Sequence, residues 1–204
     1  MSSQALALDI VTIEQKNYET VLKTPAKTVF FPLNSEDKEL IEAMKAKLES
    51  LGGVGLAAPQ VNAHKRIIAV YIPEGASLLR DNVEMHPMHI LINPSFKPES
   101  EETVSDFEAC YSVTSLAGKV PRFNRIKLSY QDETGQSHQK IASGFYARVL
   151  QHEIDHINGF LIKDRLTPDC VQGSVEDILA LRRAELSSDK QKLFDEIMSK
   201  KRKG

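Results

Sequence analysis

A central helix is predicted by residues 145–160, which read FYARVLQHEIDHINGF. His152 and His156 are four residues apart, so a helix places their imidazoles on one face, one turn from each other. We expect this helix to begin near Ser143 and to end at Gly159, because glycine readily adopts the left-handed conformation that follows a helix. The rest of the fold should therefore be arranged around a helix that carries paired histidines.

The same helix contains the motif HEIDH, residues 152–156, whose chemistry is that of a metal site. Two histidines at this spacing can bind one metal ion, and the carboxylate of Glu153 can lie beside a water at that ion. Catalytic sites of this kind use three protein ligands and keep one position open. The alternative is a helix with ordinary surface or core histidines, because short motifs also arise by chance.

The third metal ligand is left open by these residues. One class of HExxH proteases uses the sixth residue after the second histidine, which here is Ile162 and cannot bind a metal. Glu176 or Glu185 could act as a glutamate ligand from a later helix. Cys110 could act from upstream, although an isolated cysteine is more often a small buried apolar residue.

Hairpin-forming strands are predicted for the middle of the chain. We expect strands over three segments, residues 66–72, 89–94 and 125–132. Pro94 should end the second strand, residues 133–135 should turn the third back, and the glycine-rich residues 52–60 should form a loop. This pattern favours an α+β fold, with antiparallel or mixed sheets packed around the HExxH helix.

A second helix is predicted over residues 34–51. Asn34 or Ser35 can cap its start, apolar residues recur on one face, and the glycine that follows suits its end. Toward the end of the chain the composition becomes charged and helical. We expect one catalytic domain over residues 1–168 and a C-terminal helical extension or tail over residues 169–204.

Composition and charge exclude several functions. Of the 204 residues, 41% are hydrophobic and 26% are charged, and a net charge of -2 provides no basic field for nucleic acid or membrane. The stretch MSSQALALDI lacks the pattern of a signal peptide, and no apolar run is long enough to span a bilayer. Cys110 and Cys170 could form at most one disulfide. We expect a cytoplasmic protein in a reducing compartment, with no DNA or membrane partner.

Three segments resemble the signature motifs of the peptide deformylase family, in that family's order and approximate spacing. They are GVGLAAPQV at residues 53–61, EACYSV at residues 108–113 and QHEIDHINGF at residues 151–160. The resemblance extends roughly over residues 20–165. It implies a metal-dependent hydrolase that removes the N-terminal formyl group from formyl-methionyl nascent polypeptides and releases formate.

The resemblance also implies the roles of the metal-site residues. Cys110 would be the third metal ligand beside His152 and His156, and the fourth position would be left for water. Glu153 would take a proton from that water and pass it to the leaving amine.

Two donors for the developing oxyanion are implied in the same way, the side-chain amide of Gln60 and the backbone N–H of Tyr111. Gln60 has an alternative role as a loop residue that hydrogen-bonds its own backbone. Gly55 would let the loop backbone approach the substrate, or would be an ordinary turn glycine.

Supporting roles around these residues have alternatives as well. Glu108 and Arg122 could hold the cysteine segment in place, or could form a surface ion pair that is worth little. Asp155 could orient a ligand histidine or cap local structure. Phe145 and Val149 could line an apolar pocket for methionine, and are equally good core residues.

The ligand set suits one divalent metal ion. The resemblance implies Fe(II) in the cell, with zinc, nickel or cobalt in purified protein, and a formyl-methionyl peptide as substrate. The basic end, Lys200–Lys203, could make a transient ribosome contact, as in some relatives, or could be a solvated tail.

Ala109 and Tyr111 depart from the family pattern, which has glycine and leucine there. Alanine at position 109 is strained only if its φ is positive. The Tyr111 side chain could alter which residues after the formyl-methionine are accepted. Two other functions remain, an HExxH metallopeptidase and a catalytically silent deformylase-like protein that binds a metal or a peptide.

Overall fold

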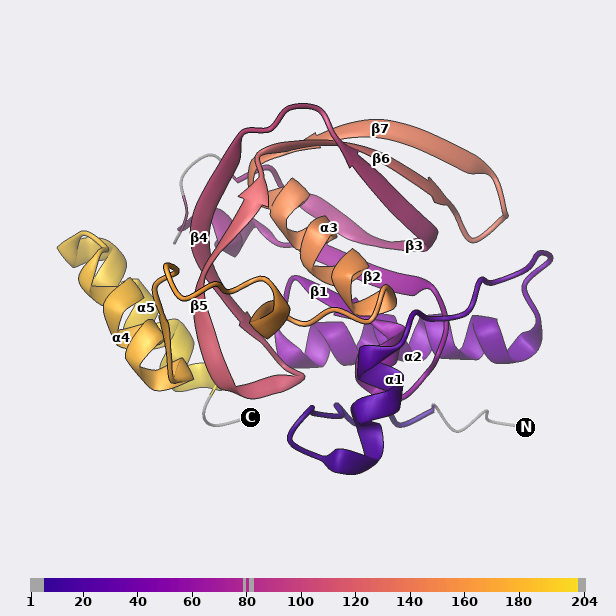
Figure 1. Ribbon diagram of the computed structural model, residues 1–204, viewed down its shortest axis with the longest axis horizontal. Helices are drawn as coiled ribbons and strands as arrows, with labels where there is room; N and C mark the ends of the chain where they lie inside the picture. Colours follow the sequence, from indigo (N-terminus) through magenta and orange to yellow (C-terminus); the bar gives the residue numbers. More distant parts are fainter. Residues whose placement is uncertain (1–5, 79, 81–82, 202–204) are drawn as a thin grey trace.

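Helix α3 (Gly144–Ile157) lies at the centre of the computed structural model, between two antiparallel sheets (Figure 1). The structure describes residues 6–78, 80 and 83–201. Residues 1–5, part of the stretch in which we expect no signal peptide, and residues 202–204 of the basic end lie outside the described residues. The predicted α+β class is confirmed, and the strands named below all pair in antiparallel fashion.

The larger sheet has five strands in the order β1-β2-β3-β6-β7. Their bounds are β1 Gly55–Ala57, β2 Ile67–Ile72, β3 His86–Pro98, β6 Arg125–Gln131 and β7 Ser137–Ser143. The smaller sheet has the order β4-β5-β8. Its strands are β4 Thr103–Cys110, β5 Val113–Phe123 and β8 Gln172–Gly173. The predicted strands near residues 67–72 and 125–131 and the hairpin after them are confirmed.

Helices surround both sheets. The α-helices besides α3 are α1 Glu19–Lys23, α2 Ser35–Leu51, α4 Val175–Ala184 and α5 Ser188–Lys201. Short 3-10 helices are η1 Lys16–Tyr18, η2 Ala58–Val61, η3 Glu74–Leu78 and η4 Ile162–Asp164. No helix among the described residues is both long enough and apolar enough to cross a bilayer.

Strand β2 is apolar on both faces because a helix covers each of them. Ile68, Val70 and Ile72 pack with α3 in one core cluster. Ile67 and Ala69 point the opposite way, as the two-residue period of a strand requires, and pack with α2 in a second cluster. Full burial of each large aliphatic side chain stabilises the fold by about 1.5–3 kcal/mol. The sheet therefore fixes the position of α3 from one side.

The predicted helix over residues 34–51 is confirmed as α2, and of the two candidate capping residues Asn34 is the N-cap. The side chain of Asn34 accepts a hydrogen bond from the Asp37 N–H at 2.8 Å. Gly52 ends the helix in the left-handed conformation, with a φ of 57°.

The prediction that Pro94 ends the second strand is wrong, because β3 continues to Pro98. Asn93 has a φ of 50°, and the register of β3 against β6 shifts between Ile92 and Ser95. Pro94 falls within this irregularity, where its missing N–H removes no ladder hydrogen bond.

The loop prediction for residues 52–60 is wrong in part. Residues 55–57 form β1, which pairs with β2, and residues 58–61 form η2. The short strand is fully buried, so the segment that leads to the site is held on the sheet rather than free in solvent.

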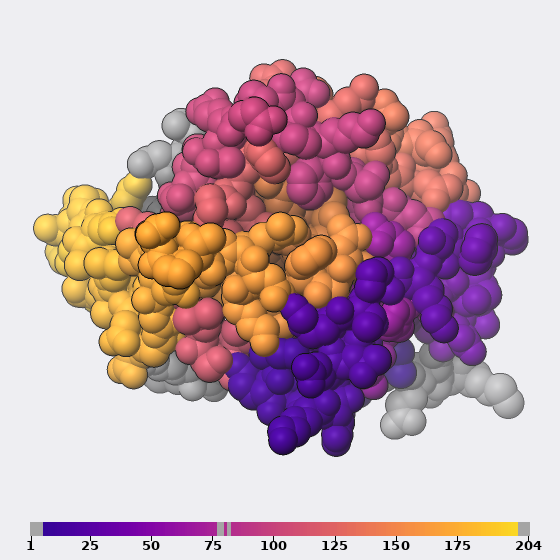
Figure 2. Space-filling model, viewed as in Figure 1, coloured from indigo at the N-terminus to yellow at the C-terminus, as the bar shows by residue number. Residues whose placement is uncertain are grey.

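The C-terminal helices lie beyond the smaller sheet. Strand β8 pairs with β5, and Ile178 of α4 packs against Phe107 and Ala117. Figure 2 shows α4 and α5, in yellow, as one end of the molecule, away from the indigo N-terminal segment. Helix α4 is therefore positioned to contribute side chains to the space beside β4.

Gly159 ends α3 as expected, and close packing against α1 leaves no room for a side chain at this position. Its φ is 80°, its N–H donates to the carbonyl of His156 at 3.1 Å, and a Cβ there would lie 2.8 Å from the backbone of Lys23. Gly144, at the start of the same helix, also has a positive φ of 58°, but a Cβ there would meet nothing within 4 Å.

These two glycines allow backbone strain to be separated from steric overlap. We expect Gly144→Ala to lower the free energy of unfolding by about 1 kcal/mol, the effect of a positive φ alone. Gly159→Ala should lower it by at least about 1 kcal/mol more, because α1 must also move. Urea unfolding of both variants measures the difference, and equal losses would contradict the packing argument.

Candidate metal centre

Three side chains converge beside α3 that could hold a metal ion. Cys110, His152 and His156 each direct one ligand atom to a common point, and these atoms lie within 4.8 Å of one another. The sulfur of Cys110 is 3.2 Å from Nε2 of His156. The histidines come from the C-terminal half of α3 and the cysteine from the end of β4, so two layers of the fold meet here.

The sulfur of Cys110 receives two N–H groups. The backbone N–H of Ser112 lies 3.4 Å from it, and Nε2 of Gln60 lies 3.6 Å from it. Cys110 is buried and is not part of a disulfide. The sulfur is therefore held at a fixed position beside the two histidines, and sulfur in its thiolate form is a metal ligand.

Gln60 makes the local backbone contact considered for it, while its amide nitrogen stays available. Its Oε1 accepts the backbone N–H of Ala57 at 2.8 Å, which is a local contact within the β1–η2 turn. The amide nitrogen is consequently directed toward Cys110. Gln60 is buried, so its donor is held in a fixed orientation at the candidate centre.

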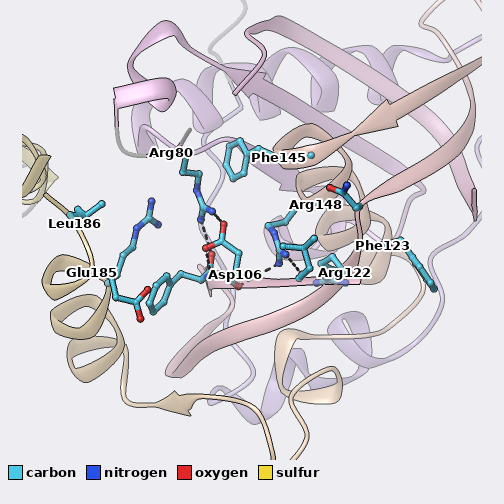
Figure 3. A pocket seen from close by; sticks show the side chains of 13 residues that line it. Arg80, Asp106, Arg122, Phe123, Phe145, Arg148, Glu185 and Leu186 are labelled. Carbon is cyan, nitrogen blue, oxygen red and sulfur yellow. Dashed lines mark hydrogen bonds and ion pairs between the residues drawn. The ribbon is translucent and has the colours of Figure 1, made fainter. Parts of the chain in front are cut away.

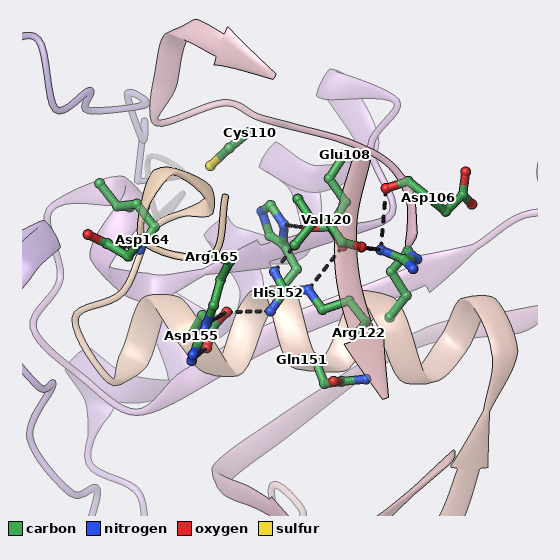
Figure 4. Close-up of polar contacts among 12 residues, drawn as sticks. Asp106, Glu108, Cys110, Val120, Arg122, Gln151, His152, Asp155, Asp164 and Arg165 are labelled. Carbon is green, nitrogen blue, oxygen red and sulfur yellow. Dashed lines mark hydrogen bonds and ion pairs between the residues drawn. The ribbon is translucent and has the colours of Figure 1, made fainter. Parts of the chain in front are cut away.

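Behind the histidines, Glu108 is the hub of a buried ion network (Figure 4). Its carboxylate accepts Nε and Nη2 of Arg122 at 3.0 and 2.9 Å, Nη1 of Arg148 at 2.7 Å, and Nδ1 of His152 at 2.9 Å. The pairing with Arg122 is confirmed and is buried, so the surface alternative is wrong. Burial opposes ionisation of Glu108, but these cationic partners outweigh it and lower its pKa.

Glu108 also decides which nitrogen of His152 faces the centre. An imidazole that donates its Nδ1–H to a carboxylate leaves Nε2 as the nitrogen with a free lone pair. Burial works against a charged His152, and the hydrogen bonds with Cys110 and Glu108 raise its pKa, so a metal that binds Nε2 would displace a proton. Burial and the positive charges of His152 and Arg122 lower the pKa of His156.

Arg148 belongs to this buried network, although the sequence patterns did not predict a role for it. Its guanidinium donates to Glu108 and to the carbonyl of Val120, both at 2.7 Å. It lies one turn before His152 on α3 and is buried. The available signal is a single arginine within the apolar run FYARVL, because a buried charge requires a partner.

Asp155 does neither of the things considered for it. Its carboxylate pairs with Arg122 and with Arg165, whose Nε lies 3.0 Å from Oδ2, and it accepts no N–H from any histidine that the structure describes. Asp155 therefore anchors the segment after α3 through Arg165, and the carboxylate that supports His152 is that of Glu108.

Glu153 lies beside the three converging side chains, and Gly55 makes room for it. A Cβ at position 55 would overlap the Glu153 carboxylate, so the space that we assign to substrate approach is occupied by this side chain. Burial raises the pKa of Glu153 to about 7. Its Oε2 is buried without a hydrogen-bond partner among the described residues.

Tyr111 packs under the segment that follows α2. Its hydroxyl donates to the carbonyl of Leu51 at 3.2 Å, and a Cβ at Gly53 would lie 2.7 Å from that hydroxyl oxygen. Among the described residues, the non-glycine residues with positive φ are Asn62 and Asn93. Ala109 therefore has an ordinary backbone and carries no strain.

The other candidate ligands and pocket residues lie elsewhere. Glu185 pairs with Lys119 at 2.7 Å, and Glu176 is exposed in the first turn of α4. Neither belongs to the converging group. Phe145 lines a cavity next to α3, whereas Val149 is buried in the core.

Comparison with known protein sequences points to one family. A family model described as polypeptide deformylase matches residues 7–172. Peptide deformylase 2 of Rickettsia conorii is 37% identical over 190 residues, which cover 91% of this chain and 93% of the relative. A peptide deformylase of Streptococcus pyogenes is 39% identical over 181 residues, covering 78% of this chain and 87% of the relative.

Solved structures agree with the sequence comparison. The Met-Ala-Ser-bound crystal structure of class I type b peptide deformylase from Acinetobacter baumannii has a TM-score of 0.70 and 29% identity, and covers 80% of this chain and 100% of that one. The crystal structure of peptide deformylase from Thermotoga maritima has a TM-score of 0.66 and 31% identity, and the match covers 80% of this chain and 99% of that one.

The buried network can be tested through stability. We expect Glu108→Gln to lower the free energy of unfolding by about 3–5 kcal/mol, because Arg148 and Arg122 lose a shared buried counter-charge and Arg122 keeps just its pair with Asp155. Glu185→Gln is the matched control, since its ion pair with Lys119 is exposed and its loss should change stability by less than about 1 kcal/mol. Chemical denaturation measures both, and equal effects would show that the Glu108 charge is not required.

Proposed function

The chain belongs to the polypeptide deformylase family, and we propose that it removes the formyl group of formyl-methionyl peptides through Cys110, His152, His156 and Glu153. Enzymes of this family are metal-dependent hydrolases that act on formyl-methionyl peptides. The convergence of the Cys110 sulfur with the two imidazoles carries the proposal, because the residues alone leave the third ligand open.

The donor set fits a divalent metal ion. One thiol and two imidazoles are buried or nearly so, and their ligand atoms lie within 4.8 Å of one another. The Nδ1 of His152 is already engaged by Glu108, so Nε2 remains for a metal. Sulfur and nitrogen ligands suit iron(II), zinc, nickel or cobalt. We propose iron(II) as the working metal, by likeness to the family.

Glu153 is the proposed proton carrier. A bound divalent ion supplies Lewis acidity and lowers the pKa of water toward neutrality. The Glu153 carboxylate accepts a proton from the water that adds to the formyl carbon. The same proton goes to the amine nitrogen as the C–N bond breaks, and formate leaves. Because burial raises the pKa of Glu153 to about 7, it can both accept and release a proton near neutral pH.

Gln60 and the Tyr111 N–H are the proposed donors to the oxygen that gains negative charge. The Gln60 amide is held beside Cys110 by the Ala57 contact, so no reorganisation is needed when the charge develops. Gly55 is proposed to act indirectly, by leaving the space that the Glu153 side chain occupies.

Two further proposals concern the C-terminal segment. We assign residues 1–168 to the catalytic domain and residues 169–204 to a helical extension, whose α4 packs on the smaller sheet. The transient ribosome contact is proposed for the basic end, of which residues 202–204 lie outside the described part of the chain.

Activity and the role of Glu153 can be tested together. Metal-loaded protein should release formate from formyl-Met-Ala-Ser under anaerobic conditions. Glu153→Gln should lower kcat by about 10²–10⁴-fold with unchanged metal content, because an amide cannot accept the proton. A fully metallated wild-type protein that released no formate would instead support the catalytically silent alternative.

The ligand set distinguishes a deformylase from an HExxH metallopeptidase. Cys110→Ala should lose its stoichiometric metal, because two imidazoles remain from a three-ligand site. Glu185→Gln should keep it, although a peptidase with a downstream glutamate ligand would lose it. Elemental analysis of both purified variants gives the answer, and the opposite pattern would favour the peptidase.

Tyr111 is proposed to influence which peptides are accepted. Tyr111→Leu removes the ring beside Gly53, and we expect the order of kcat/KM values to change across peptides that differ after the formyl-methionine. Tyr111→Phe keeps the ring and loses only the hydrogen bond to Leu51. The order of kcat/KM values across the peptides should therefore be preserved, and each value should fall by about tenfold or less. Identical profiles for wild type and Tyr111→Leu would reject the idea.

A further inference from the structure

A basic cavity of about 310 Å³ lies beside the candidate metal centre, between β4, the start of α3 and α4 (Figure 3). Four arginines line it, Arg80, Arg122, Arg148 and Arg182, together with the carboxylates Asp106 and Glu185. None of the three converging side chains, nor Glu153, is among its lining residues. The cavity is therefore next to the proposed reaction site but is not lined by the residues proposed to carry the reaction.

Both carboxylates in the cavity wall are already neutralised. Asp106 forms an ion pair with Arg80, and Glu185 binds Lys119 at 2.7 Å. Arg122 is likewise bound by Glu108 from behind the wall. These groups cannot balance a further positive charge.

The guanidinium of Arg182 has no such partner. It makes no hydrogen bond or ion pair with any residue that the structure describes, and burial lowers its pKa. Burial, together with repulsion from Arg182 and Arg148, lowers the pKa of Arg80 to about 9. The three guanidinium groups are thus close enough to repel one another, and one of them offers all of its N–H donors.

An anionic group would resolve this arrangement. A free guanidinium presents a planar fork that matches a carboxylate or a phosphate. The N–H groups of Arg80 and Arg148 are engaged with Phe107, Asp106, Glu108 and Val120, so these two arginines contribute positive potential rather than direct bonds.

We propose that this cavity binds a single anionic group, a carboxylate or a phosphate, on the guanidinium of Arg182. The volume suits one small anion or one side chain. Two sources share this chemistry, a free anion and an acidic side chain of the peptide substrate. The peptide source rests on the proposed function, since it requires a peptide substrate. It is within reach because Arg148 lies one turn before His152, which places the cavity along the face of α3 that carries the histidines.

Direct binding is the first test and does not depend on catalysis. Inorganic phosphate, titrated by calorimetry at constant ionic strength, should bind to wild type and bind at least about tenfold more weakly to Arg182→Gln. Arg183→Gln is the matched control, because its neighbouring guanidinium pairs with Asp195 and does not line the cavity. Equal phosphate affinity in all three proteins, or no binding to wild type, would overturn the proposal.

Substrate pairs separate the two sources. Formyl-Met-Ala-Glu and formyl-Met-Ala-Gln differ only in one charge, and a kcat/KM ratio that favours glutamate in wild type and disappears in Arg182→Gln would identify the substrate as the source. A ratio of one together with Arg182-dependent phosphate binding would identify a free anion. If neither peptide is hydrolysed, the proposed function fails, while the phosphate titration still decides whether the cavity binds an anion.

Discussion

The candidate centre depends on one buried carboxylate, that of Glu108. A charge removed from water is unfavourable unless it is fully paired and hydrogen-bonded, and both oxygens of Glu108 meet that condition. Its partners come from β5, through Arg122, and from α3, through Arg148 and His152. These contacts join β4, β5 and α3, so pairing of the Glu108 carboxylate favours the observed docking of the strands on the helix.

That requirement also places the thiol. Cys110 follows Glu108 by two residues on β4, so its side chain is carried to the same helix face that holds the paired imidazoles. The segment from β1 to η2 enters from the other side, where Gln60 is fixed by Ala57 and Gly55 leaves space for Glu153. Local contacts therefore fix the orientation of Gln60, and the missing side chain of Gly55 leaves the space that Glu153 occupies.

Sequence patterns predicted the parts of the fold that have local signals. The helix over residues 34–51 has a cap and an apolar face, and HEIDH has a spacing that only a helix makes useful. The β4–β5 hairpin lacks such a signal, since burial along β4 does not alternate and the adjacent residues Phe107 and Glu108 are both buried. The prediction that Pro94 ends a strand was wrong because the strand can continue through Pro94 where Asn93 has a positive φ. Hydrogen bonds between the Asn93 side chain and the backbone of Val29 support that φ, and such tertiary contacts are not visible in the sequence.

The same reasoning explains what could be predicted of the site. HEIDH identifies two imidazoles and a carboxylate without outside help, whereas the choice of Cys110 over a downstream glutamate came from resemblance. Neither the HEIDH motif nor the resemblance indicated Arg148, because its contact with Glu108 forms only when the fold brings β4 to α3. Long-range electrostatic pairing has no signature at the level of periodicity.

The three candidate ligand atoms come from two layers of the fold, the α3 helix on the larger sheet and the end of β4 in the smaller one. An ion that requires all three can bind only the docked state, so its binding free energy adds directly to the free energy that keeps the layers together. Linkage makes this reciprocal: a substitution far from the centre that loosens the interface must weaken ion affinity by the same coupling. The affinity for the metal ion would thus measure how stably the two layers are docked.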